Sequence, residues 1–442
     1  MTKKKNTSLK KRPTTKKKIN ADNFWKTMRF KEETLIGDKL RKLLHADIIE
    51  PIIEKCRFQV RKDYWHSVFS GHSFHIDKDL SPELFGICQE VLDTLHFTEP
   101  VNFFITNDPQ VNAAAYMKGE QDNSHVVVIN SGLVESFSEK ELKFVIGHEI
   151  GHLIYKTAEI RRLINYLFEE ERFIPISIQN LISLWEKFAE ISADRMGFIA
   201  SPCVESCITN FFKLSSGISL EKVNLNAKAF MKKMDEMLIR AKQGEYQILF
   251  GSSHPSNPVR VKAIELFSES KTYKEYAASH KIVKSDKDLG KEMQELLDLM
   301  ELFPTSQRDY YRSMVVAAGG ILIAGLDAHI TMEENDEIVE YLAKFTARPK
   351  VFLRNLQAQA KTREGLQETL IGAIYCLLEA DPEERYSIFY YLCRVVIADH
   401  ELSEQEIHFL MDIATKHLGM HEIEANRLFL ENLRSSGFTP RF

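Results

Sequence analysis

The stretch that decides the fold runs from Ser138 to His152 and reads Ser-Glu-Lys-Glu-Leu-Lys-Phe-Val-Ile-Gly-His-Glu-Ile-Gly-His. Ser138, followed three residues later by Glu141, forms a capping box before an apolar run, so the spacing predicts a helix beginning here. In that helix His148 and His152 lie one turn apart on the same face. Glu149 is turned aside, where it can reach a metal-bound water. This H-E-x-x-H pattern is typical of two imidazole zinc ligands and a general base on one helix.

The same pattern also fits a buried helix whose histidines only form hydrogen bonds, so residues elsewhere have to decide between the two interpretations. A catalytic zinc ion takes three protein ligands and keeps one open position. A second long helix, predicted from about Ser177 to Ala200, places Glu190 and Asp194 on one face. Glu190 can be the third ligand, while Asp194 can orient an imidazole. The small or apolar neighbours of Glu190 argue against a pair of surface acids.

Length and composition indicate an ordinary globular protein with two or three domains, because 442 residues exceed one typical hydrophobic core. The hydrophobic fraction of 44% and the charged fraction of 27% are average values. Six cysteines without a framework spacing predict reduced thiols and a cytoplasmic protein. Cys203 and Cys207, one helical turn apart, could supply half a metal site, but packing is favoured because no second pair accompanies them.

The charge is unevenly distributed. Residues 1–20 hold nine Lys or Arg and no acid, which leaves −14 on the remainder of a chain whose total is −5. Such an acidic body argues against a specific nucleic-acid partner. The tail is expected to be disordered, and a solubilising role is favoured over a tether to nucleic acid or anionic lipid. It lacks the apolar core of a secretory signal, and no run spans a membrane, Met314–Leu326 being too short.

Periodicity predicts mainly helices with one small sheet. Residues 21–64 read as a helical N-terminal segment with a break at Pro51. Residues 271–304 are charged and read as a linker or an exposed helix, and residues 305–442 read as helical throughout. Three short β-branched runs just before the H-E-x-x-H helix predict a three-stranded sheet: Val101–Thr106, Asn112–Met117 and His125–Ile129.

A weak internal repeat lies in the last third of the chain. Asp327–Glu334 aligns with Asp399–Glu406, 72 residues later. In each copy Thr331 or Ser403 can cap a helix, and the Glu that ends the segment closes a capping box. Capping is favoured over cation binding, because the segments lack the alternating oxygen ligands of a calcium loop.

Four separate features of the chain carry a resemblance to a known family. They are Asn112-Ala113-Ala114 opening the second predicted strand, the H-E-x-x-H helix, Glu190 with Asp194, and His254-Pro255-Ser256 with Arg260. Residues 65–270 therefore resemble the HtpX/CAAX-protease-type zinc metallopeptidases, the gluzincin family numbered forty-eight among the metallopeptidases. Many relatives carry transmembrane helices, whereas this chain resembles the soluble branch.

This resemblance implies a hydrolase, a zinc endopeptidase that binds one Zn²⁺ per chain through His148, His152 and Glu190. Glu149 would be the catalytic base, and His254 would help to stabilise the transition state. Asp194 and Arg260 would support the ligands and the buried acidic groups from behind. An extended peptide or protein substrate would pair with the sheet edge near Asn112–Ala115, with Asn112, Ala113 and Ala114 as the binding residues.

Residues 305–442 are similar to the tellurite-resistance TerB-like helical domain, with Ala328 and His400 where that family often has Gly. The resemblance implies a regulatory or interaction domain that offers its helical grooves to a protein partner. The expected fold is therefore mainly α with a small three-stranded sheet in a gluzincin-type domain, followed by an all-α TerB-like domain. The alternative function is a catalytically silent metal-binding scaffold or sensor.

Overall fold

The computed structural model describes residues 20–56, 62–168, 174, 176–218, 226–242, 255–280, 291–301, 307–326, 331–346 and 349–439. The basic tail up to residue 19 and His254 lie outside the described residues. The part of the chain up to residue 301 contains the sheet and these helices: α1 (Ala21–Met28), α2 (Lys31–Leu43), α3 (Ala46–Cys56), α4 (Tyr64–His72), α5 (Pro82–Thr94), α6 (Ser131–Ser136), α7 (Glu139–Ile154), α8 (Thr157–Leu167), α9 (Ile176–Ala200), α10 (Val204–Ser216), α12 (Ala227–Lys242), α13 (Asn257–Glu269), α14 (Lys271–Ser279) and α15 (Lys291–Glu301).

The sheet is mixed and has four strands, β1 (Phe74–Ile76), β2 (Val101–Thr106), β3 (Ala113–Tyr116) and β4 (His125–Asn130), in the order β1-β2-β4-β3. β2 and β4 are parallel, while β1 and β3 are antiparallel to their neighbours. The prediction of three strands is therefore wrong by one. β1 was missed because three residues are too short to show a two-residue alternation of polar and apolar side chains.

Alternate side chains of the central strands reach two different cores, as the pleat of a strand requires. Phe104, Val126 and Val128 pack under Trp65 and Phe69 of α4. On the opposite face, the side chains of β2 and β4 join the main core with residues of α5, α7 and α9: Phe103, Val127, Ile129, Val91, Phe144 and Met196. β3 remains at the edge of the sheet, next to α7.

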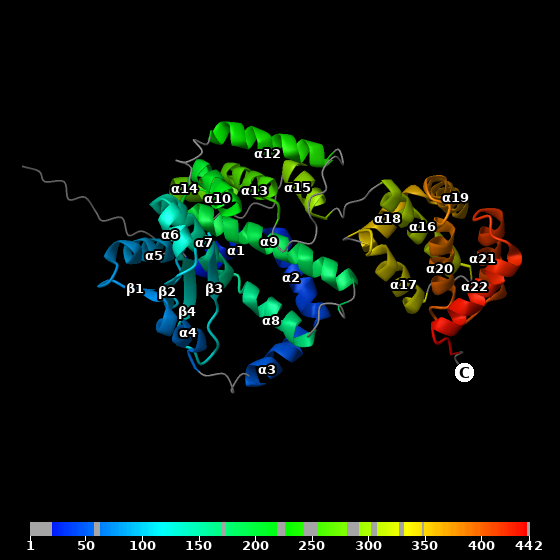
Figure 1. Ribbon diagram of the computed structural model, residues 1–442, viewed down its shortest axis with the longest axis horizontal. Helices are drawn as coiled ribbons and strands as arrows, with labels where there is room; N and C mark the ends of the chain where they lie inside the picture. The colour runs from blue at the N-terminus through cyan, green and yellow to red at the C-terminus, as the bar shows by residue number, and fades with distance from the viewer. Residues whose placement is uncertain are drawn as a thin grey trace, which may run out of the picture.

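A seam of glycines lets α7 and α9 lie side by side at the centre of this part (Figure 1). A Cβ added to Gly147 would lie 2.6 Å from Cβ of Ala200. A Cβ added to Gly197 would lie 2.7 Å from the backbone oxygen of Phe144. The two helix backbones therefore approach closely, and side chains on the facing surfaces can converge.

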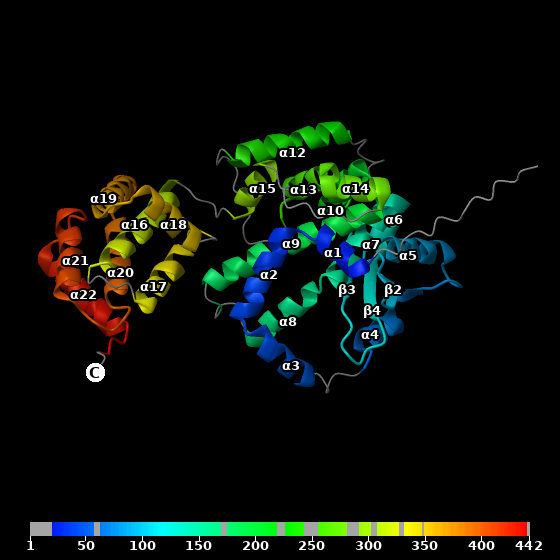
Figure 2. The same cartoon turned by 180° about the vertical axis from the view of Figure 1, so that it is seen from behind.

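The N-terminal helices pack against this pair, with α2 running along α9 (Figure 2). Ser192 of α9 donates a hydrogen bond to Glu33 Oε2 at 3.0 Å and accepts one from the backbone N–H of Phe30 at 3.2 Å. The predicted break at Pro51 is wrong, because α3 continues through it. The apolar face of α3, which buries Ile53 in the core around α8 and α9, outweighs the lost backbone hydrogen bond.

The rest of the described chain is helical: α16 (Gln307–Ala324), α17 (Met332–Leu342), α18 (Pro349–Gln359), α19 (Arg363–Ala380), α20 (Glu384–Val396), α21 (Glu404–Lys416) and α22 (Glu422–Ser435). These helices share a hydrophobic core of their own, and Figure 1 shows them grouped apart from the sheet.

Both predicted capping boxes of the repeat are confirmed, at Thr331 before α17 and at Ser403 before α21. Asp327 and Ala328 lie outside the described residues. His400 has a φ of +66°, the left-handed conformation that Gly adopts more readily.

None of the helices in the described part of the chain combines the length and apolar character that crossing a bilayer requires. The five cysteines whose side chains are described, Cys88, Cys203, Cys207, Cys376 and Cys393, are free thiols. Cys207 is buried, in line with packing. Cytoplasmic location remains a prediction.

Candidate metal centre

The N-terminal end of α7 is fixed by more than its capping box. Glu141 accepts hydrogen bonds from the backbone and hydroxyl of Ser138 at 2.8 and 2.7 Å. It also receives Lys213 Nζ at 2.7 Å and the hydroxyl of Thr209 at 2.7 Å, both from α10. Burial raises the pKa of Glu141, but these hydrogen bonds outweigh burial and lower it. The helix is thereby held in position along its axis.

Three ligand atoms converge where α7 faces α9. Nε2 of His148 lies 3.1 Å from Nε2 of His152. Nε2 of His148 lies 3.5 Å from Oε2 of Glu190, and Nε2 of His152 lies 3.5 Å from Oε1 of the same carboxylate. Among the described residues, these three form the one group of His, Cys, Asp or Glu side chains that could hold a metal ion. They are the same three residues that were predicted from the sequence to bind the metal.

The outer nitrogens of both imidazoles are held in place. Nδ1 of His148 lies 2.9 Å from Oδ1 of Asp194. Nδ1 of His152 lies 3.2 Å from the hydroxyl of Thr157, which itself donates to the backbone carbonyl of His152. Both partners can accept a hydrogen bond from Nδ1–H, which leaves Nε2 of each ring as the atom that faces the shared centre and can bind a metal.

The donor set fits a divalent cation such as zinc. Burial lowers the pKa of His148, but the hydrogen bond to Asp194 and the nearby charge of Glu190 outweigh it and raise that pKa to about 10. Burial and the charge of His148 lower the pKa of His152 to about 3, although Glu190 opposes them. Without a metal, His148 is thus protonated on both ring nitrogens at neutral pH, whereas His152 is neutral. Two imidazole nitrogens and a carboxylate are the ligands of many catalytic zinc sites.

A buried arginine supports the acidic side chains. Arg260 of α13 donates to Asp194 through Nε at 2.8 Å and through Nη2 at 2.6 Å, and Nη2 lies 3.5 Å from Glu190. Burial raises the pKa values of both carboxyls, but Arg260 and the histidines outweigh burial and keep them low. The guanidinium stacks 4.7 Å from the ring centroid of Phe211.

Glu149 lies between the metal ligands and the edge of the sheet. Its side chain is 8% exposed, and burial, together with Glu190, raises its pKa against the opposing charge of His148. The backbone N–H of Ala115 in β3 donates a hydrogen bond to it. The carboxylate is therefore held next to the ligand cluster without belonging to it.

The backbone of β3 alternates between its neighbour and its free edge. The backbone N–H of Asn130 donates to the carbonyl of Asn112 at 3.0 Å, so Asn112 and, by alternation, Ala114 face β4. Ala113 and Ala115 face the free edge. The side chain of Asn112 accepts from the N–H of Ala113 at 2.9 Å. Of the three residues predicted to bind substrate, only Ala113 turns its backbone to the open edge.

Thr157 is a residue of the site that the sequence did not point to. Thr157 begins α8, and nothing in its local sequence shows that the chain turns back to His152. Ala115 belongs to the predicted Asn112–Ala115 edge, but which edge each backbone faces becomes known only with the strand partner. His254 and its predicted role lie outside the described residues.

A helix with the H-E-x-x-H motif, packed against a second helix that supplies a glutamate, defines the metallopeptidase class with a two-histidine, one-glutamate site. Residues 80–267 match peptidase family M48, and residues 313–428 match the tellurite resistance protein TerB. Residues 80–267 are therefore a peptidase M48 domain of the HtpX-like kind, and residues 313–428 are a C-terminal TerB domain, as the resemblance predicted.

Named relatives agree with this assignment. The chain is 24% identical over 221 residues to the plastoglobule-localized metallopeptidase 48 of Arabidopsis thaliana, covering 46% of this chain and 62% of that protein. It is 33% identical over 78 residues to a protease HtpX homolog of Streptococcus uberis, covering 18% of this chain and 25% of that protein. The chain thus spans less than two thirds of the length of these relatives. No solved structure matches it.

Proposed function

We propose that the protein is a zinc-dependent endopeptidase that hydrolyses peptide bonds in peptide or protein substrates. The observation that carries this proposal is the convergence of His148, His152 and Glu190, with Glu149 held beside them by the edge strand β3. Zinc bound there would supply a water of lowered pKa and would polarise the scissile carbonyl.

The side chains of this protein have distinct tasks in the reaction. Glu149 accepts the proton of the attacking water and passes it to the leaving amine, and burial strengthens it as a base by raising its pKa. Asp194 and Arg260 keep His148 in its orientation. His254 is proposed to stabilise the oxyanion, on the basis of the family resemblance.

Substrate is proposed to bind as an added strand at the free edge of β3. The backbones of Ala113 and Ala115 face that edge, where their carbonyls can accept hydrogen bonds from an extended peptide, since the N–H of Ala115 is already directed at Glu149. The side chain of Asn112 covers the N–H of Ala113 and would have to give way. Pairing through the backbone selects an extended conformation more than a particular sequence.

The first prediction tests the role of Glu149. Glu149→Gln should lower turnover by about 10²- to 10⁴-fold, the range of general acid–base catalysis, while zinc remains bound. Metal content is measured by inductively coupled plasma mass spectrometry, and cleaved peptides are identified by mass spectrometry of a digested unfolded protein mixture. Glu139→Gln, an exposed glutamate of the same helix, is the matched control.

Two results would contradict the proposal. Near-normal proteolysis by Glu149→Gln would remove this residue from its role as base. Stoichiometric zinc in the wild-type chain without any cleavage would instead support the alternative, a silent metal-binding scaffold that acts through its TerB domain.

A further inference from the structure

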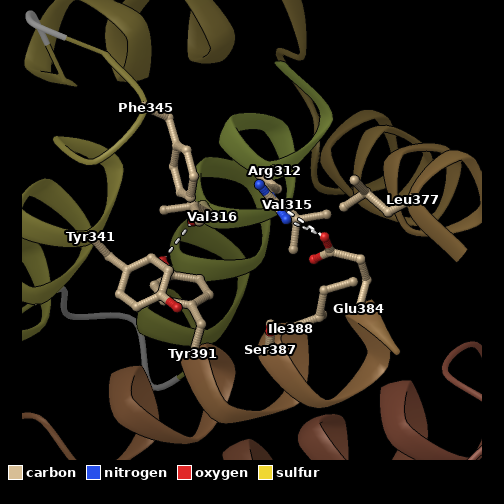
Figure 3. A pocket seen from close by; sticks show the side chains of 10 residues that line it. All are labelled: Arg312, Val315, Val316, Tyr341, Phe345, Leu377, Glu384, Ser387, Ile388 and Tyr391. Atoms are coloured by element: carbon tan, nitrogen blue, oxygen red, sulfur yellow. Dashed lines mark hydrogen bonds and ion pairs between the residues drawn. The ribbon is translucent and has the colours of Figure 1, made fainter. Parts of the chain in front are cut away.

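A cavity of about 170 Å³ lies within the TerB domain, between α16, α17, α19 and α20. Figure 3 shows its walls, which are mainly apolar and aromatic: Val315, Val316, Tyr341, Phe345, Leu377 and Ile388. A cavity of about 150 Å³ in a protein core is large enough to take benzene. A single aromatic ring or a branched aliphatic group therefore fits this cavity.

One wall of the cavity carries a buried charge, the carboxylate of Glu384 at the start of α20. Its side chain is 4% exposed. Arg308 donates to Oε1 from Nε at 2.8 Å, and Arg312 donates to the same atom from Nε at 3.1 Å. The second oxygen, Oε2, has no hydrogen-bond partner in the described part of the chain, and Figure 3 shows it turned toward the space beside Val315. A buried carboxylate oxygen is stabilised by a donor.

The charges around Glu384 favour a cation over an anion. Nη2 of Arg308 lies 2.5 Å from Oδ2 of Asp381, and Nη1 of Arg312 lies 3.0 Å from Oδ1 of Asp309. Among the described residues, three carboxylates and two guanidinium groups thus meet at this end of the cavity, and these five groups carry one net negative charge. Arg312, the arginine that lines the cavity, already donates from Nε, Nη1 and Nη2 to Glu384 and Asp309, so it is not available to an incoming carboxylate.

The aromatic side of the cavity adds selectivity for an apolar body. The hydroxyl of Tyr391 donates to the backbone carbonyl of Val316 at 2.7 Å, so this ring is fixed. Tyr341 packs against it, with ring centroids 4.5 Å apart. The two rings form a rigid apolar wall across from Leu377 and Ile388 (Figure 3).

We propose that this cavity is a binding site for a primary ammonium group attached to a single apolar body, such as an aromatic ring or branched alkyl group. The ammonium donates to Oε2 of Glu384, and the body fills the space between the tyrosine wall and the aliphatic side chains. A free small amine and an apolar residue at a peptide N-terminus share this chemistry.

The test uses the full-length protein and isothermal titration calorimetry. 2-Phenylethylamine should bind with a dissociation constant on the order of 1 mM or tighter, as expected for nine non-hydrogen atoms. Phenylacetate, which has a similar body and the opposite charge, should bind at least about tenfold more weakly. Equal affinities, or no binding of the amine at about 10 mM, would overturn the proposal.

Two variants place the ligand in this cavity. Ser387→Trp, at the exposed rim, should fill the entrance and abolish binding, whereas Ser435→Trp on α22, also exposed, should bind normally. Glu384→Gln can still accept from the arginines while presenting an N–H group to the cavity, and should weaken amine binding at least about tenfold. Unchanged binding by Ser387→Trp would show that the amine binds elsewhere and would reject the site.

A further pair of probes separates the two sources of the ligand. Phe-Gly-Gly-amide with a free N-terminus should bind more tightly than 2-phenylethylamine if the site takes peptide N-termini, and more weakly if it takes free amines. N-acetylated Phe-Gly-Gly-amide should not bind in either case. Equal binding of the acetylated and free peptides would overturn the proposal, because the acetyl group removes the ammonium.

Discussion

At the scale of single residues, the metal centre depends on groups that do not reach the metal position. His148 is oriented by Asp194 at 2.9 Å, and Asp194 is in turn fixed by two hydrogen bonds from Arg260. All three side chains are buried. Replacing Asp194, which lies between His148 and Arg260, changes the basicity and the orientation of His148 without removing a metal ligand.

Asp194→Asn should therefore weaken zinc binding by about 10- to 100-fold, the usual effect of losing a carboxylate that orients a metal-binding imidazole. The affinity is measured by competition with a chromogenic chelator. Asp93→Asn, an exposed position on α5, serves as the control. Equal zinc affinity of Asp194→Asn and wild type would show that Asp194 only pairs with Arg260.

At the scale of elements, the site is created by the closeness of α7 and α9. Gly147 and Gly151 of α7 and Gly197 of α9 leave no room for a side chain between the helices. Only this spacing brings Glu190 within 3.5 Å of both histidines. The glycines therefore matter for metal binding although they offer no ligand atom.

Gly197→Ala should push the helices apart, because its Cβ would lie 2.7 Å from the backbone oxygen of Phe144. We expect a loss of about 1–3 kcal/mol in the free energy of unfolding and a reduced zinc content. Thermal unfolding and metal analysis check both effects. Gly86→Ala on α5, where a Cβ meets nothing within 4 Å, should keep full zinc content. A fully zinc-loaded Gly197→Ala protein would contradict this account of the seam.

The start of α7 gives a prediction about pH. The hydrogen bonds from Lys213, Ser138 and Thr209 hold the pKa of Glu141 below its ordinary value of 4.5, despite burial. A lowered pKa in the folded state means that this stabilisation is present above pH 4.5 and is lost as pH falls through the folded-state pKa.

Glu141→Gln should thus cost about 3 kcal/mol at pH 7, since it leaves the buried Lys213 without its counter-charge. The difference in the free energy of unfolding between this variant and wild type should shrink at pH values below the lowered pKa of Glu141. Denaturant unfolding at a series of pH values measures this, with Glu139→Gln as the exposed control. A difference that stays constant with pH would exclude Glu141 as the titrating group.

At the scale of the whole molecule, the two parts of the chain meet where α9 approaches α17. The side-chain amide of Asn180 donates to the backbone carbonyl of Ala343 at 2.6 Å, in a buried position. Ala343 lies between Tyr341 and Phe345, which line the TerB cavity, and α9 also carries Glu190. The contact therefore joins the helix of the metal centre to the wall of the cavity.

Asn180→Ala should loosen this contact, because an unsatisfied buried carbonyl costs about 1–3 kcal/mol. We expect a larger radius of gyration in small-angle X-ray scattering and an unchanged zinc content. Asn355→Ala, an exposed residue of α18, should leave both values unchanged. An unaltered radius of gyration for Asn180→Ala would show that other contacts hold the two parts together.

The sequence by itself determined the features that depend on residues close along the chain. The H-E-x-x-H helix, the long helix with Glu190 and Asp194, and the capping boxes at Thr331 and Ser403 follow from spacings of three or four residues, which one helical turn brings together. Predicting Glu190 as the third metal ligand also needed a motif outside the H-E-x-x-H helix, the pair Glu190 and Asp194. Spacing within one helix cannot show which other helix faces it.

Only the tertiary structure decided what depends on contacts distant in sequence. β1 is too short to have a pattern of its own and forms because β2 lies beside it. Thr157 and Ala115 join the site through the packing of α8 and β3 against α7. The TerB cavity is the space left between four helices. Such features leave no pattern in the local sequence, because the contacts that stabilise them are made with residues that lie far away along the chain.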